Sequence, residues 1–234
     1  LVILSHVFLT LDYTVQGPLL QFLSYFFWKI GIGVSIFFVL SGFLLSYPFW
    51  ERYLSNRDFP DIKDYAIKRA ARIMPGYYAA LIVSLLVVYA FNQPMEYAVR
   101  RIVTAFTFTS GFHYTTFFSS RVDAPLWSVS FEVFSYVLMP VFFFLIFKST
   151  GRKSSFLKGA SSWIAVFAVM IGINHLIHVY FTPDNINRGW QYGIIGGAKA
   201  WMPGYNPVGL FGHFIFGIIA AGIGSLICLR VCTP

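Results

Sequence analysis

The chain has 234 residues, of which 57% are hydrophobic and 11% are charged, and its mean hydropathy is +0.68. Soluble domains carry about 25% charged residues, so this composition excludes a water-soluble globular protein. The net charge of +8 does not indicate nucleic acid binding, because the basic residues lie at the ends of long apolar runs, where they set topology or meet lipid head groups.

Uncharged runs of about 20 residues recur along the chain, and each is long enough to cross a hydrocarbon core as an α-helix. Backbone groups cannot stay unpaired in lipid, and the runs lack the alternation of barrel strands, so we expect an all-α, polytopic transmembrane helical bundle. The first segment, 1–11, has no basic flank before it, so we expect the natural chain to begin earlier. Further spans are expected over 31–49, 73–91, 125–147, 160–181 and 207–229.

Two basic links set the orientation of these spans. The link 51–72 carries six Lys and Arg residues, and the link 148–158 carries four with no acid among them. The positive-inside rule places both on the cytoplasmic side. Residues 184–199, which carry little charge, suit the outer face.

The segment 102–118 is a poor candidate for a full span, because it is rich in Thr and contains Gly111 and His113. If it crossed the membrane, the helix 125–147 would run outward and expose the second basic link. We therefore predict a re-entrant or interfacial element near 102–118, and about six to seven membrane segments in all.

Small residues recur in the last span, at Gly217, Ala220, Ala221 and Gly224. Such residues could let two helices approach closely. They could equally be ordinary membrane composition, and we interpret them in that way.

Glu132 is the residue that most strongly indicates a functional site, since it is the one charged residue within the run 124–147. A carboxylate in a span costs a few kcal/mol and usually has a partner, although it could also serve stability alone. Glu132 lies about 10 Å along its helix from Pro125, and His6 lies about 9 Å from the outer end of its own helix, near Asp12. A carboxylate that orients an imidazole makes a general base, so the pair is a candidate catalytic site, while the alternative for His6 is a buried neutral histidine.

Lys68, Arg69 and Arg72 form a second candidate group at the cytoplasmic mouth of a span. Arg69 and Arg72 share one helical face, and arginine suits bidentate phosphate contacts. The default explanation for such a basic group is that it sets the topology of the span or contacts lipid head groups. His175 and His178 are three residues apart but lack a further ligand, so we expect no metal site, and His113 and His213 have no recognisable context.

Three segments together resemble the acyltransferase 3 family of integral membrane O-acyltransferases. The segment GVSIFFVLSGFL at 33–44 resembles a family helix, KRAARIMPGY at 68–77 resembles its basic motif, and PLWSVSFE at 125–132 resembles its PLWSLSxE motif, with Tyr136 and Pro140 following. Lys68 and Val133 depart from the family pattern, which has arginine and often glutamate there.

The resemblance implies one partial acyltransferase domain over 1–234, from a family bundle of about ten helices. It implies a multi-pass protein of the bacterial inner membrane that moves an acyl group, usually acetyl, from cytoplasmic acyl-CoA to a hydroxyl of an envelope carbohydrate. His6 matches the family's proposed catalytic base and Glu132 its motif glutamate, and Arg69 and Arg72, with Lys68 beside them, match its CoA phosphate site. Two alternative interpretations are a proton-coupled transporter, in which His6 and Glu132 relay protons, and a structural membrane subunit.

Overall fold

The computed structural model describes residues 17–19, 22, 33–120, 124–150, 155–180 and 202–232. Regular structure in these residues is helical and includes no strand. The elements are α3 (Gly33–Leu54), α4 (Ile62–Ala90), α5 (Ala98–Phe106), the 3-10 turns η1 (Ser110–Phe112) and η2 (Ala124–Leu126), α6 (Trp127–Thr150), α7 (Phe156–Tyr180) and α9 (Pro207–Cys232).

Five of the described helices, α3, α4, α6, α7 and α9, are long and apolar enough to cross a membrane. They coincide with the five spans predicted after the first, so the prediction of an all-α, multi-pass bundle is confirmed. The predicted span at 1–11 lies outside the described residues.

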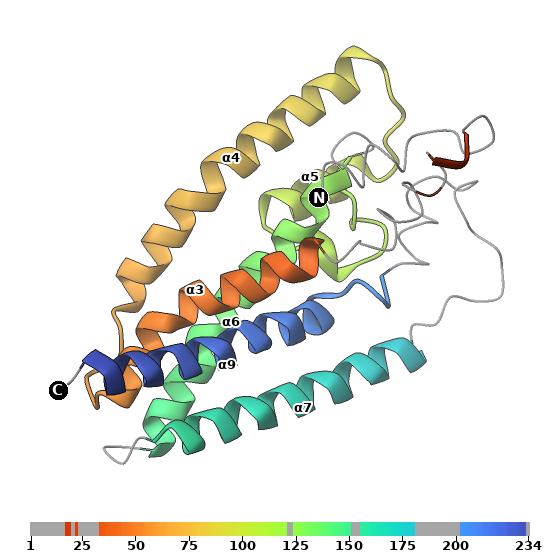
Figure 1. Cartoon of the computed structure of the whole chain (residues 1–234). Coiled ribbons are helices and arrows are strands. Elements are labelled where there is room, and N and C mark those ends of the chain that lie inside the picture. Colours follow the sequence, from red (N-terminus) through yellow and green to blue (C-terminus); the bar gives the residue numbers. More distant parts are fainter. Residues whose placement is uncertain are drawn as a thin grey trace.

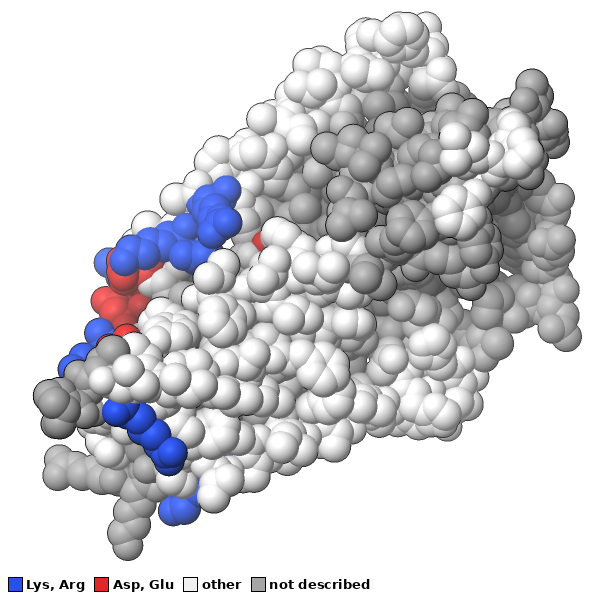
Figure 2. Space-filling model, viewed as in Figure 1, with Lys and Arg blue, Asp and Glu red and all other residues white. Residues whose placement is uncertain are grey.

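Basic side chains gather at one end of the bundle, which we call the basic end (Figure 2). The carboxyl ends of α3, α6 and α9 and the amino ends of α4 and α7 meet there (Figure 1). These helix ends carry Arg52, Lys63, Lys148, Lys158 and Arg230. The two predicted basic links thus lie on the same side, as the positive-inside rule requires.

The connection between α4 and α6 lies at the opposite, far end of the bundle, because α4 runs away from the basic end and α6 runs back toward it (Figure 1). Within 102–118 the chain forms the end of the nine-residue α5 and the short turn η1, and no helix there is long enough to span a membrane. The prediction that 102–118 is not a full membrane span is confirmed on this point. Whether the segment enters the bilayer stays a prediction.

Helix starts follow from local capping residues. Asp61 accepts hydrogen bonds from the backbone N–H groups of Lys63 and Asp64, at 2.8 and 3.4 Å, and so caps the amino end of α4. Asn206 accepts from the N–H of Gly209 at 2.9 Å and is followed by Pro207 at the first helical position of α9.

The closest packing in the bundle joins α3 to α9 through two glycines. A Cβ added to Gly217 would lie 1.9 Å from the carbonyl oxygen of Val39, and one added to Gly42 would lie 2.1 Å from that of Phe214. Because both neighbours are backbone atoms, the two helices can touch at this distance only where the side chain is a hydrogen atom. The interpretation of the small residues as ordinary membrane composition is therefore wrong for Gly217.

Aromatic side chains fill the core among α3, α6, α7 and α9. Trp50 and Trp163 are fully buried, and Phe143 lies between them with ring centroids 5.8 and 5.0 Å away. The indole N–H of Trp50 donates to the carbonyl oxygen of Ile218 at 2.7 Å, so this large side chain also meets its polar requirement inside the core.

Helix α4 packs against this core with Tyr65 and Ile73 and is tied to its neighbours by three tyrosine hydroxyls. Tyr65 donates to the carbonyl oxygen of Tyr136 at 3.1 Å, and Tyr77 and Tyr78 donate to those of Ala105 and Phe106, each at 3.0 Å. These contacts hold α4 beside α6 at one level and beside α5 at another, and they leave space between α4 and α6.

Candidate active site

Glu132 lies in the second turn of α6, half-buried, with its carboxylate turned toward Tyr136 on the same helical face. The Tyr136 hydroxyl donates a hydrogen bond to Oε1 of Glu132. Residues four apart on a helix are neighbours, so this partner could have been found from spacing alone. From the sequence, Tyr136 is predicted only as part of a motif, and its hydrogen bond to Glu132 is an additional finding.

A second neighbour of Glu132 comes from α4. The charge of the Arg72 guanidinium acts on the Glu132 carboxylate, although the two residues belong to different helices. A carboxylate within an apolar span is stabilised by such a cation and by a hydroxyl donor. The expected requirement for a partner is thus met by Tyr136 and Arg72, while His6, the partner predicted from depth, lies outside the described residues.

Helix α3 adds a third contribution through Ser41, whose hydroxyl is a polar neighbour that stabilises the charged form of the Tyr136 hydroxyl. Ser41 directly precedes Gly42, so the close approach of α3 to α9 also fixes where this hydroxyl lies. Tyr136 thereby joins Ser41 to Glu132. The three motif segments, at 33–44, 68–77 and 125–132, each supply one residue that acts on Tyr136 or on Glu132, and we call Ser41, Arg72, Glu132 and Tyr136 the polar cluster.

An apolar groove of about 680 Å³ runs between α4 and α6 beside the polar cluster. Its polar lining consists of Arg69, Tyr65 and Tyr136. Nε of Arg69 is buried without a hydrogen-bond partner among the described residues, an arrangement that costs free energy until an acceptor is supplied. The groove is lined by Phe59, Ile62, Tyr65, Ala66, Arg69, Ala70, Ile73, Met74, Phe108, Val133, Tyr136, Val137, Pro140, Val141 and Phe144.

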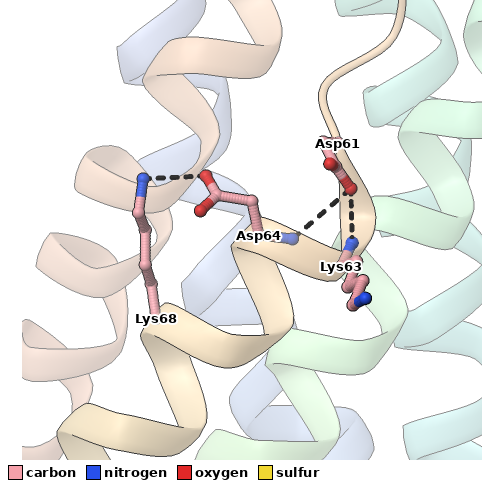
Figure 3. Close-up of polar contacts among 4 residues, drawn as sticks. All are labelled: Asp61, Lys63, Asp64 and Lys68. Carbon is pink, nitrogen blue, oxygen red and sulfur yellow. Dashed lines mark hydrogen bonds and ion pairs between the residues drawn. The ribbon is translucent and has the colours of Figure 1, made fainter.

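Lys68 takes a different direction from its neighbour Arg69. Its ammonium group lies 2.7 Å from the Asp64 carboxylate, one turn back on α4, and both side chains are exposed (Figure 3). The three predicted phosphate ligands therefore separate: Arg69 faces the groove, Arg72 acts on Glu132, and Lys68 forms a surface ion pair.

The remaining histidines lie away from the polar cluster. His113, in the far-end connection, accepts a hydrogen bond from the N–H of Thr115 at Nδ1 over 3.2 Å, and burial together with the charge of Arg100 lowers the pKa of its imidazole. His175 and His178 are exposed on α7, and His213 is half-buried on α9. Among the described residues, no three His, Cys, Asp or Glu side chains are grouped as metal ligands would be.

Comparison with known proteins gives a family and two relatives. A family model described as "Acyltransferase domain" matches residues 1–231. The peptidoglycan O-acetyltransferase OatA of Listeria monocytogenes is 27% identical over 168 residues, which is 67% of this chain and 25% of that protein. A Bacillus subtilis protein named "Putative peptidoglycan O-acetyltransferase YrhL" is 28% identical over 162 residues, 63% of this chain and 25% of that protein. No solved structure matches the chain.

Proposed function

Because this chain belongs to the acyltransferase domain family, we propose that it is part of a membrane O-acyltransferase that moves an acyl group, in particular acetyl, from cytoplasmic acyl-CoA to an envelope carbohydrate. The chain spans about a quarter of the length of the curated relatives it matches, and both carry peptidoglycan O-acetyltransferase in their names. By this likeness the proposed acceptor is a hydroxyl of peptidoglycan or a related glycan. The proposed location is the bacterial inner membrane.

The observation that carries this proposal is the polar cluster, which joins one residue from each of the three motif segments beside a groove that reaches the basic end. In the proposed arrangement the CoA phosphates lie near Arg69 at the expected cytoplasmic side, and the pantetheine arm follows the groove toward Tyr136. The apolar walls exclude water from the thioester, which protects it from hydrolysis.

The proposed chemistry is a single acyl transfer. His6 takes the proton of the acceptor hydroxyl while that oxygen attacks the thioester carbonyl carbon, and the C–S bond then breaks. The CoA thiolate leaves and takes up the proton from the imidazolium. Glu132, which accepts a hydrogen bond from Tyr136 and is stabilised by the charge of Arg72, stabilises the charged imidazolium directly or through water.

Replacing His6 with alanine in the full-length protein should abolish acyl transfer and leave the amount of membrane-inserted protein unchanged. A general base contributes about 100- to 10,000-fold to a rate, so the loss should exceed 100-fold. Mass spectrometry of O-acetyl groups on envelope glycans measures the outcome. Unchanged acetylation would remove His6 from the mechanism, and proton flux without acyl-CoA consumption would favour a transporter.

Arg69 and Lys68 offer a matched test of donor binding, because they are adjacent cations with different surroundings. Arg69→Ala should raise KM for acyl-CoA about tenfold or more, since it removes a donor that no described residue satisfies. Lys68→Ala should change KM less than about twofold, because this ammonium group is committed to an exposed pair with Asp64. Steady-state kinetics at varied acyl-CoA concentration make the comparison. Equal increases in KM for the two variants would mean that acyl-CoA binding depends only on the total positive charge of this segment.

A further inference from the structure

A second, smaller pocket lies between α7 and α9, on helices that supply no residue of the polar cluster. Its volume is about 180 Å³, and it is lined by Phe167, Met170, Ile171, Asn174, Val208, Gly209, Gly212, His213 and Phe216. Asn174 lies six residues before Tyr180 and His213 six after Pro207, so both lie about 9 Å from the far end of their helices. The walls are otherwise apolar, and none of these lining residues carries a permanent charge.

The orientation of the Asn174 amide follows from backbone groups. The N–H of Gly209 can only donate, so the Asn206 atom that it meets at 2.9 Å is the oxygen. Nδ2 of Asn206 then donates to the carbonyl oxygen of Pro203 at 2.9 Å and to Oδ1 of Asn174 at 2.7 Å. Asn206 is buried, with 2% of its surface exposed, so this arrangement is held inside the protein. The Nδ2 group of Asn174 remains as a donor.

The orientation of the His213 ring follows in the same way. Its Nδ1 lies 3.3 Å from the carbonyl oxygen of Gly209, and a carbonyl only accepts, so Nδ1 carries the hydrogen. Nε2 of the neutral ring is then an acceptor. The pocket therefore combines one amide donor and one imidazole acceptor among apolar side chains.

Gly209 and Gly212, which have no side chains, leave open the space between the Asn174 amide and the His213 ring. A Cβ on Gly209 would lie 3.1 Å from Oδ1 of Asn174, and one on Gly212 would lie 3.5 Å from the Phe167 ring. The Asn174 amide thus lies directly over the backbone of α9. A side chain larger than hydrogen at either position would take up space that the pocket now holds open.

We propose that this pocket binds the acetamido group of an N-acetylated sugar, as a specificity subsite for the carbohydrate acceptor. A secondary amide presents one acceptor and one donor, which match Asn174 Nδ2 and His213 Nε2, and its methyl group fits against Phe167, Met170 and Phe216. A sugar hydroxyl would satisfy the two polar groups but leave the apolar walls unfilled, and an anionic group would find no cation. The role as acceptor subsite rests on the proposed function.

The test uses the full-length protein in lipid nanodiscs without acyl-CoA. The probes are chitotetraose and cellotetraose, which differ because chitotetraose carries acetamido groups where cellotetraose carries hydroxyl groups. Saturation-transfer NMR should show strong signals for the acetamido methyl groups of chitotetraose, and cellotetraose should bind about tenfold more weakly or not at all. His213→Phe should weaken chitotetraose binding about tenfold. Gly212→Val, which keeps both polar groups and fills the space, should do the same.

Two matched controls accompany these variants. His175→Phe changes an exposed histidine on α7, and Gly224→Val changes a glycine of α9 whose nearest side-chain atom is 3.7 Å from the added Cβ. Both should bind chitotetraose as the wild type does. Equal binding of the two tetrasaccharides, or wild-type binding by both pocket variants, would overturn the proposal. If chitotetraose binds as expected but no acyl group reaches any carbohydrate when acyl-CoA is added, the pocket's ligand class stands and the proposed function fails.

Discussion

Replacing Gly217 with alanine is expected to prevent α3 and α9 from packing and to remove most of the folded protein. The new methyl group would lie 1.9 Å from the carbonyl oxygen of Val39 and 2.6 Å from the backbone nitrogen of Phe43. Backbone atoms of a helix cannot rotate away as a side chain can, so the helices must separate. Overpacking in a core usually costs about 1–3 kcal/mol, and a clash with two backbone groups belongs at or above the top of that range.

The matched control is Gly224→Ala, the same chemical change on the same helix. Its Cβ would lie 3.7 Å from the Phe43 ring, an ordinary contact, and alanine favours a helix over glycine by about 1 kcal/mol. Fluorescence-detected size-exclusion chromatography after stepwise heating would compare the two variants. Gly217→Ala should aggregate well below the wild type, whereas Gly224→Ala should match or exceed it. If both variants behave alike, contact between the two backbones does not hold this helix pair together.

Glu132→Gln is expected to reduce acyl transfer about 100-fold or more, with little change in the amount of folded protein. Glutamine keeps an oxygen that can accept from the Tyr136 hydroxyl but removes the charge that would stabilise an imidazolium and that Arg72 balances. Tyr136→Phe should reduce transfer less, by about tenfold, because the carboxylate remains but loses its hydroxyl donor and its connection to Ser41.

The double variant shows whether Glu132 and Tyr136 act as one unit. If Tyr136 works only by holding the carboxylate, adding Tyr136→Phe to Glu132→Gln should cost almost nothing further, and the two effects will not add. Initial rates of acetyl transfer in nanodiscs supply the four values of the cycle. Additive losses would show that Tyr136 acts independently of Glu132. A rate near the wild type for Glu132→Gln would remove the carboxylate from the mechanism.

The spans were predictable from the sequence because a helix that crosses a bilayer needs a sufficiently long run of apolar residues. The length of such a run can be counted along the chain without knowing any contact. The caps Asp61 and Asn206 were not predicted, although their hydrogen bonds reach residues within one helical turn. Topology could also be derived, since a full span at 102–118 would have left the basic links on opposite sides. Glu132 was conspicuous because a lone carboxylate in lipid is costly.

What could not be predicted depends on contacts between distant residues. Gly217 and Gly224 have similar helical surroundings in the sequence, yet only the first meets the backbone of α3. Lys68 and Arg69 are adjacent basic residues; the pair of Lys68 with Asp64 follows from i,i+4 spacing, but that Arg69 lines the groove depends on how α4 packs against α6. The electrostatic effect of Arg72 on Glu132 links residues of two helices that are 60 positions apart, which no local pattern encodes.

The tyrosine contacts that hold α4 have a consequence for how the protein tolerates mutation. Tyr65, Tyr77 and Tyr78 donate to main-chain carbonyls, and every residue type offers such a carbonyl. Side chains at the accepting positions can therefore change during evolution while α4 keeps these three hydrogen bonds, provided that the three tyrosine hydroxyls are retained. Tyr136 is one of those accepting positions, so replacing its side chain leaves the carbonyl that anchors α4 in place, while it changes the surroundings of Glu132 and Ser41.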